Sequence, residues 1–278
     1  MSAKPSRARI NGPPRLAWLV VVTLACLAAA LLLPAMPQPQ RYHDFADART
    51  LLNTPNALNV LSNAGFLVAG LAGLAVSLSP AGHFRHPAER VPYAVFFAGL
   101  LLTAFGSGWY HLAPGNERLY WDRLPMTVSF AGLIAGQLSD RVDSKAGLWA
   151  LVPMLAAGAL SVGYWRATER AGAGNVLPYA ILQGYAMVAV LGLALAQPSR
   201  YTHAGMIYWV FAWYAASKLL ETLDAPVMAL LGSLSGHTLK HLAAAMSGIV
   251  VAMMLARRRP VEADARNKAL EPHPVARM

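Results

Sequence analysis

The stretch VLPYAILQGYAMVAVLGLALAQ, residues 176–197, decides the fold, because it holds no charged residue along its whole length. A helix needs about 20 mostly apolar residues to cross a bilayer, so we predict that this stretch spans a membrane. The same criterion selects seven further windows: 16–36, 56–79, 91–112, 119–138, 145–164, 204–222 and 237–256. The sequence therefore predicts an all-α membrane protein with eight transmembrane helices.

The composition of the 278-residue chain excludes an ordinary soluble domain. Hydrophobic residues make up 56% of it and charged residues only 13%, whereas soluble domains carry about 25% charged residues. The single cysteine, Cys26, lies inside an apolar run. An intrachain disulfide and a thiolate metal cage are therefore excluded as well.

Positive charge is in excess, with 23 Lys and Arg against 13 Asp and Glu and a formal net charge of +10. In a soluble protein this would suggest nucleic-acid binding, but in a membrane protein it marks the cytoplasmic loops. If the N-terminus lies inside, the inner segments hold fifteen basic residues: nine in the N-terminus and inner loops, and six in the C-terminal tail. The outer loops hold only five, which are Arg41, Arg49, Arg118, Arg166 and Arg170. We therefore expect both termini in the cytoplasm and no nucleic-acid partner.

The windows divide the chain into four parts: a basic cytoplasmic N-terminus at 1–15, an extra first helix at 16–36, a seven-helix domain at 42–257 and a polar tail at 258–278. The tail has few apolar residues, so we expect it to be disordered in the cytoplasm. A cleaved signal peptide is the alternative for the first helix, because a basic flank precedes it. Its apolar run exceeds a signal core of about 7–15 residues, which favours a retained anchor.

Ionisable residues in a predicted span are costly in lipid and indicate function. His111 ends the third predicted helix, one turn after Ser107, and Asp122 opens the fourth. His237 and His241 open the eighth, and their i,i+4 spacing puts both imidazoles on one helix face. The predicted topology places the three histidines and Asp122 on the outer side of the membrane.

Three histidines with a free fourth position are the ligand set of a catalytic zinc ion, which acidifies its bound water. Asp122 can take a proton from that water and return it to a leaving group. Ser107 can hydrogen-bond the water or a developing oxyanion. The histidine pair is not the zinc-protease signature, because Thr238 stands where that motif has Glu.

Each residue also has a structural interpretation. The histidine pair can simply meet water and headgroups at the interface. Asp122 can pair with Arg123 or cap its helix, and Ser107, between two glycines, can permit close helix packing. The common membrane depth of the histidines and Asp122 favours the metal site.

Two more polar groups lie in the predicted helices. In the second predicted helix, Asn56, Asn59 and Asn63 share one stripe beside Ser62. These residues either orient the metal ligands or hold neighbouring helices together. We favour the role in holding helices together. In the seventh, Lys218, Glu221 and Asp224 follow each other at intervals of three. We expect a structural ion pair of Lys218 with Glu221, with Lys240 as another partner, and contact with a substrate is the alternative.

Taken together, the chain resembles the alkaline ceramidase family of the CREST superfamily of seven-helix membrane hydrolases. The resemblance covers about residues 42–257 and rests on an ordered set of short motifs: Asn-x-x-Ser-Asn at 59–63, Ser107 four residues before His111, Asp122 eleven residues after it, and a late His-x-x-x-His at 237–241. It implies a seven-helix bundle of ceramidase type, so the first helix is an extra one.

The resemblance also implies Zn²⁺ bound by His111, His237 and His241, with Ser107 and Asp122 beside the metal water. The substrate implied is a lipid amide such as ceramide, which enters from the bilayer and is split into a long-chain base and a fatty acid. As a bacterial-type member, the protein is expected in the inner membrane with its site facing the periplasm. The acidic calcium cluster of animal and yeast members is reduced to Asp44 and Asp47, so the calcium site of those members is not carried over to this chain.

Three rival functions stay open on the residues alone. An intramembrane serine protease would use Ser107 with His237 or His241, although Phe105 replaces the first glycine of the Gly-x-Ser-Gly motif. A receptor or transporter would hold a structural metal and use the Lys218 group for a ligand or protons, although repeats and broken helices are not evident. A bis-histidine haem site is the third.

Overall fold

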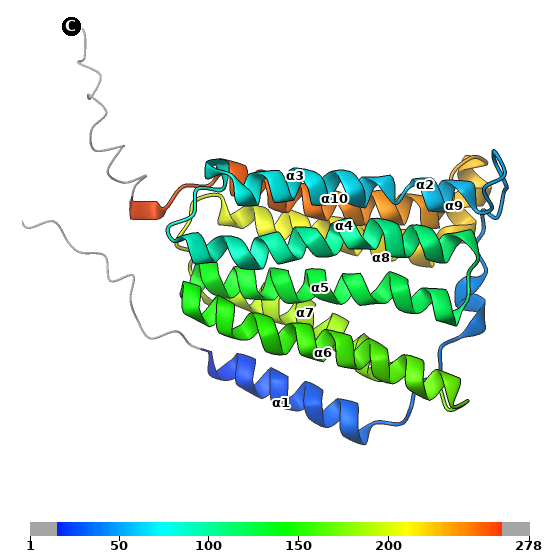
Figure 1. Ribbon diagram of the computed structural model, residues 1–278, viewed down its shortest axis with the longest axis horizontal. Coiled ribbons are helices and arrows are strands. Elements are labelled where there is room, and N and C mark those ends of the chain that lie inside the picture. The colour runs from blue at the N-terminus through cyan, green and yellow to red at the C-terminus, as the bar shows by residue number, and fades with distance from the viewer. Residues whose placement is uncertain (1–15, 263–278) are drawn as a thin grey trace, which may run out of the picture.

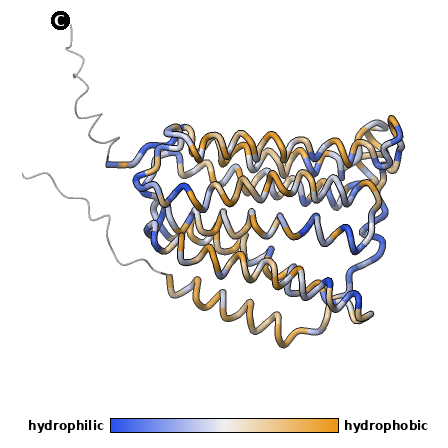
Figure 2. The backbone as a smooth tube through the Cα atoms, viewed as in Figure 1, coloured by the Kyte–Doolittle hydropathy of each residue, from blue (hydrophilic) through white to orange (hydrophobic). Residues whose placement is uncertain are grey.

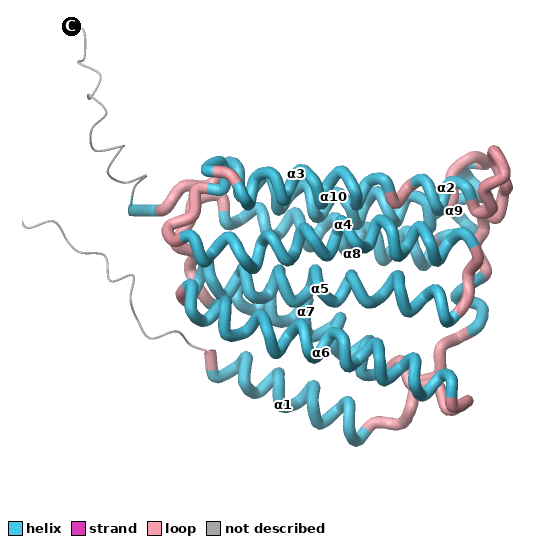
Figure 3. The backbone as a smooth tube through the Cα atoms, in the orientation of Figure 1, coloured by secondary structure: helices cyan, strands magenta, loops and turns pink. Residues whose placement is uncertain are grey.

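The computed structural model describes residues 16–262, which form a bundle of α-helices and contain no β-strand. The helices run roughly side by side along the long axis of the molecule (Figure 1). Figure 3 shows that loops occupy the two ends of the bundle and helices its length. The α-helices are α1 Ala17–Leu32, α2 Ala57–Leu61, α3 Ala64–Leu78, α4 Arg90–Leu112, α5 Asn116–Arg141, α6 Ser144–Arg170, α7 Leu177–Ala196, α8 Ile207–Thr222, α9 Asp224–Leu231 and α10 Gly236–Arg257.

Five helical segments of the described chain are long and apolar enough to cross a membrane: Ala57–Leu78, Pro87–Leu112, Ser144–Arg170, Leu177–Ala196 and Gly236–Arg257. They match five of the eight predicted spans. The other three predicted spans are also helices, but α1 and α8 have only 16 residues each. Helix α5 is long enough to cross a membrane but too polar by this criterion, because it carries charged residues near both of its ends.

The bundle exposes apolar side chains along its length. Trp149 is 81% exposed and Leu160 is 72% exposed, both on α6. Figure 2 shows hydrophobic residues along the helices and hydrophilic ones gathered at the two ends of the bundle. Such a surface is costly in water and is the expected one in lipid, so the fold is that of a multi-pass membrane protein.

Glycine lets α4 and α5 approach so closely that their backbones touch. A Cβ atom on Gly106 would lie 2.0 Å from the carbonyl oxygen of Trp121, and one on Gly132 would lie 2.4 Å from the backbone nitrogen of Phe96. Small residues of this kind are typical of helix contacts in membranes. The contact at Gly106 brings Ser107 of α4 next to the first turns of α5.

Helix α1 packs on the outside of the bundle against α7. The Trp18 indole fills the place of a side chain at Gly192, and the hydroxyls of Thr23 and Tyr185 lie 3.0 Å apart. The loop that follows α1 is tied to the start of α7 by a hydrogen bond of 2.8 Å from the Val176 amide to the Met36 carbonyl. This loop then crosses the end of the bundle where α4 ends and α5 begins, which we call the site end.

A network of buried charges closes the opposite end. The Arg258 guanidinium lies 2.7 Å from the Asp140 carboxylate, which also accepts a bond of 2.6 Å from the Tyr93 hydroxyl. Tyr201 and Arg200 bond to Glu89 in the same network. Arg258 is completely buried.

The start of the C-terminal tail is therefore packed, in contrast to the expected disorder of 258–278. Besides the buried Arg258, Tyr201 and Pro260 form an isolated β-bridge, and the Thr202 amide donates to the Arg259 carbonyl at 2.9 Å. The physical reason is that the buried Asp140 carboxylate needs a cation, and Arg141, its neighbour on α5, bonds to Gln137 instead. The rest of the tail (263–278) and the basic N-terminus (1–15) lie outside the described residues.

Candidate metal centre

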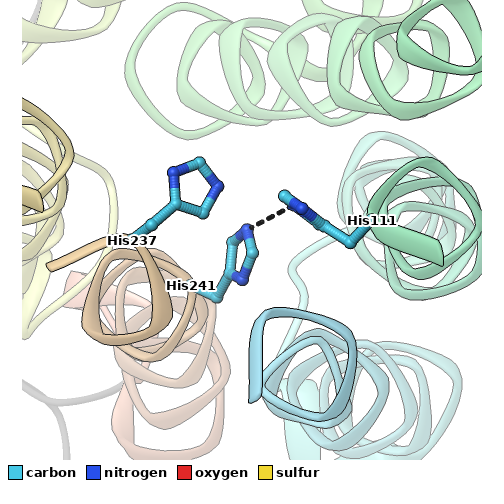
Figure 4. A group of neighbouring side chains, drawn as sticks. All are labelled: His111, His237 and His241. Carbon is cyan, nitrogen blue, oxygen red and sulfur yellow. Dashed lines mark hydrogen bonds between the residues drawn. The ribbon is translucent and has the colours of Figure 1, made fainter. Parts of the chain in front are cut away.

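The structure brings His111, His237 and His241 together at the site end. One ring nitrogen of each lies within 4.8 Å of those of the other two, and the Nε2 atoms of His111 and His241 are 3.2 Å apart. Figure 4 shows the three rings converging, His111 from one side and the two others from the first turns of α10. All three side chains are buried. The expected convergence of two helices on one point is therefore present.

The start of α10 is fixed by two capping contacts. The Ser235 hydroxyl accepts from the Thr238 amide at 3.1 Å, which is a normal N-cap. The Asp224 carboxylate, from the start of α9, accepts from the His237 amide at 2.7 Å. The sequence interpretation grouped Asp224 with Lys218 and Glu221, whereas its role here is to hold the turn that carries the histidine pair.

Ser62 orients the ring of His241. Its hydroxyl donates to the Asn59 carbonyl at 3.0 Å, and its oxygen lies 2.8 Å from Nδ1 of His241. Because the only hydroxyl hydrogen is used on Asn59, Nδ1 of His241 is the donor to Ser62. The opposite nitrogen, Nε2, then carries the free lone pair that a metal needs.

The asparagines of the same stripe hold the surrounding backbone. Asn56 donates to the carbonyl of His111 at 2.9 Å, and Asn59 accepts from the Thr238 hydroxyl at 2.8 Å. Asn63 bonds to the Asn59 carbonyl at 2.8 Å. The stripe thus joins α2 to both histidine-bearing helices, and Ser62 bonds to an imidazole through its side chain.

These residues fit a metal ion. Three nitrogen donors converge in a buried place, and Nδ1 of His111 has no hydrogen-bond partner. Imidazole nitrogens suit ions such as Zn²⁺, Cu²⁺, Fe²⁺ and Ni²⁺. Phe45, from the loop after α1, packs on the rings of His111 and His237 with centroid distances of 4.7 and 4.5 Å, and so covers the cluster.

Asp122 and Ser107 share a cavity with one residue of this cluster, His241. The two side chains are beside one another, and both are buried. No hydrogen bond joins Ser107 to a histidine in residues 16–262, so a serine–histidine pair of the protease kind is not formed there. The pairing of Asp122 with Arg123 is also not found, because Arg123 bonds instead to Gln38 at 2.6 Å.

The cavity has a volume of about 390 Å³ and runs from the site end into the bundle. Ser107, Asp122 and His241 line its site end together with Arg123, Lys218, Glu221 and Lys240, whereas Phe96, Leu100, Phe130, Leu133, Met187 and Val210 line its deeper part. Phe130 and Leu133 follow Asp122 on α5 by eight and eleven residues, so the apolar part extends about 12–16 Å from Asp122 at the helical rise of 1.5 Å per residue.

The charged group of α8 is an ion-pair network, as expected. Glu221 lies 2.8 Å from Lys218 and 2.7 Å from Lys240. All three side chains also line the cavity, so the alternative of substrate contact is compatible with their position.

The loop 36–47 was missed as part of the site by the sequence interpretation. It contributes Gln38 and Tyr42 to the cavity and Phe45 to the histidine cluster. The sequence gives only a weak indication that this loop belongs to the site. The indication is a group of aromatic and polar residues in a short connection ahead of the second predicted span. Asp47, considered above as a remnant of a calcium cluster, is bonded to Arg49 at 2.7 Å.

No known family model matches the chain, and no curated protein matches it either.

Proposed function

We propose that the protein is a zinc-dependent intramembrane hydrolase of a long-chain lipid amide. The observation that carries this proposal is the cavity, which joins His241, Ser107 and Asp122 to a long apolar part. A binding site for a metal alone needs no such space, whereas a lipid hydrolase needs both an acid–base group and room for an acyl chain. The resemblance to alkaline ceramidases points to the same activity, with ceramide as the implied substrate.

In this proposal each side chain has one task. When bound, zinc supplies Lewis acidity that polarises a carbonyl and acidifies water. Asp122 takes a proton from the attacking water and gives it to the amide nitrogen as the C–N bond breaks. The Ser107 hydroxyl donates to the oxygen that becomes negative in the transition state. Ser62 holds His241 in the ligating tautomer.

The arrangement of α7 and α8 supports entry of the lipid from the side. Helix α7 packs against α1, α5 and α6, whereas α8 packs against α10. Residues of both helices line the cavity, and Gln183 of α7 donates to the Tyr214 hydroxyl of α8 at 2.6 Å. We propose that the lipid enters the cavity between these two helices. The hydrogen bond between Gln183 and Tyr214 would break to let it pass.

We further propose that all eight predicted helices lie in a bacterial inner membrane, with both termini in the cytoplasm and the metal site toward the periplasm. The excess of Lys and Arg in the inner segments supports this orientation. The histidine cluster and the buried network of Arg258 lie at opposite ends of the bundle, so the orientation puts the network at the cytoplasmic end.

The test combines metal analysis with lipid-product mass spectrometry on the purified full-length protein. We expect about one zinc per chain, hydrolysis of a long-chain amide, and loss of both in His111→Ala, His237→Ala and His241→Ala. Asp122→Asn is expected to keep the metal and lose about 10²–10⁴-fold in rate. His203→Ala, at the opposite end of the bundle, is the control that keeps metal and activity.

Full activity in a chelator-treated, metal-free preparation would refute the proposal. Tight binding of a lipid amide with bound metal and no turnover would instead support the receptor-like alternative, in which the metal is structural.

A further inference from the structure

One of the cations that line the cavity, Arg123, forms no ion pair within residues 16–262. Three cations line this cavity, Arg123, Lys218 and Lys240, and the two carboxylates are Asp122 and Glu221. Glu221 pairs with both lysines, whereas no carboxylate of residues 16–262 lies within ion-pair distance of Arg123. A buried cation without a partner is costly, and in a membrane protein it indicates function.

Arg123 is also held firmly in place. Its side chain is only 6% exposed, and its Nη2 donates to Gln38 at 2.6 Å. The guanidinium lies 4.5 Å from the ring of Trp165 and 4.9 Å from that of Tyr179. Nη1 is buried and has no hydrogen-bond partner, so one strong donor is fixed at the cavity wall and unused.

The position of Arg123 fixes which part of a substrate it would meet. It follows Asp122 directly on α5, and the Gln38 that binds it belongs to the loop across the site end. The apolar part of the cavity extends in the other direction, past Phe130 and Leu133. An amide at Asp122 with its acyl chain in the apolar part therefore has its amine-side substituent near Arg123.

We propose that the substrate is an N-acyl amino acid, whose carboxylate is bound by Arg123. This inference rests on the proposed hydrolysis of a long-chain lipid amide, and it narrows the substrate to amides that carry a carboxylate. Water adds to the acyl carbon, the C–N bond breaks, and the amine nitrogen takes up the proton, which gives a fatty acid and a free amino acid. Arg123 acts as a specificity residue that binds the carboxylate, which the reaction leaves unchanged.

The test compares N-palmitoylglycine with N-palmitoylethanolamine, which share the acyl chain and the amide and differ in the carboxylate. A charge-assisted hydrogen bond predicts a preference of about 10- to 100-fold in kcat/KM for N-palmitoylglycine. Arg123→Gln should abolish this preference, chiefly through KM, and Arg123→Lys should keep part of it. Arg118→Gln is the matched control, because Arg118 lies five residues earlier on the same helix and stacks on Trp109 outside the cavity.

Binding of the two lipids to the full-length, metal-free protein in detergent supplies a second readout. Wild type and Arg118→Gln should bind N-palmitoylglycine more tightly, and Arg123→Gln should bind both lipids equally. Equal binding and turnover of the two lipids by the wild type, or a preference for ceramide, would overturn the proposal while leaving the hydrolase function intact. If no amide is hydrolysed, the hydrolase function fails and the binding preference still decides the role of Arg123.

Discussion

The hydroxyl oxygen of Ser62 lies 2.8 Å from Nδ1 of His241, although 179 positions separate the two residues in the chain. This contact joins the break between α2 and α3 to the first turns of α10. It fixes the tautomer of one candidate metal ligand, because the Ser62 hydrogen is already used on Asn59.

Ser62→Ala should therefore weaken metal binding without removing it. Loss of an outer partner of a ligating histidine typically costs 10- to 100-fold in metal affinity, about 1.4–2.7 kcal/mol. A competition titration against a zinc chelator measures this change. Ser247→Ala is the control, since the Ser247 hydroxyl bonds only within α10, to the Ala244 carbonyl. Equal affinity of Ser62→Ala and wild type would contradict the role given to Ser62.

Gly106→Ala adds only one methyl group, but it should disturb the candidate site strongly. The new methyl group would lie 2.0 Å from the Trp121 carbonyl oxygen, so α4 must move away from α5, and overpacking of this kind costs about 1–3 kcal/mol. Because a displacement of about 1 Å can cost 10²-fold in rate, activity should fall more steeply than stability. Thermal unfolding in detergent and product formation are the two measurements.

Gly108→Ala provides the comparison on the same helix. A Cβ atom at Gly108 meets nothing within 4 Å, so this variant should keep its melting temperature and activity. The interpretation of the α4–α5 contact would be wrong if both glycine variants behaved alike.

Arg258→Met should destabilise the bundle by about 3–5 kcal/mol, because it leaves the Asp140 carboxylate buried without its cation. The double variant Asp140→Asn with Arg258→Met should recover a large part of the loss, since it removes the uncompensated charge. Thermal unfolding of the purified protein measures both effects. Arg257→Met, at the exposed neighbouring position, is the control and should leave the melting temperature unchanged. If Arg257→Met lowered the melting temperature as much as Arg258→Met, the role given to the Arg258–Asp140 ion pair would be refuted.

Glu117 should give the site end a pH-dependent contact. Hydrogen bonds from Arg170 and Arg166 lower the pKa of this carboxyl from 4.5 to about 2, and they tie the start of α5 to the end of α6. A lowered pKa means that the contact stabilises the fold fully above pH 4.5 and is lost as the pH falls through about 2.

Glu117→Gln should thus lower the melting temperature slightly at neutral pH, as expected of an exposed ion pair. The difference from wild type should shrink from pH 4.5 downward and vanish below about pH 2, where the native carboxyl is also protonated. Melting curves of both proteins across this range, at constant ionic strength, measure it. A difference that stayed constant with pH would show that the charge of Glu117 is not its cause.

The sequence by itself determined the apolar helices and the placement of His237 and His241 on one helix face. Apolar runs of membrane length fix the helices, because backbone groups in lipid must bond within their own helix. The i,i+4 spacing fixes the histidine pair, because it depends only on helical periodicity. These features are local, so a linear pattern is enough to predict them.

Only the tertiary structure decided how the polar residues are partnered. Asp122 and Arg123 are neighbours in the chain, yet they form no ion pair within residues 16–262, and Arg123 bonds to Gln38 from a distant loop. Ser62, Phe45 and Arg258 likewise have partners far away in the sequence. The physical reason is that helix spacing fixes the face of a side chain, whereas the packing of separate helices and loops decides what that face meets.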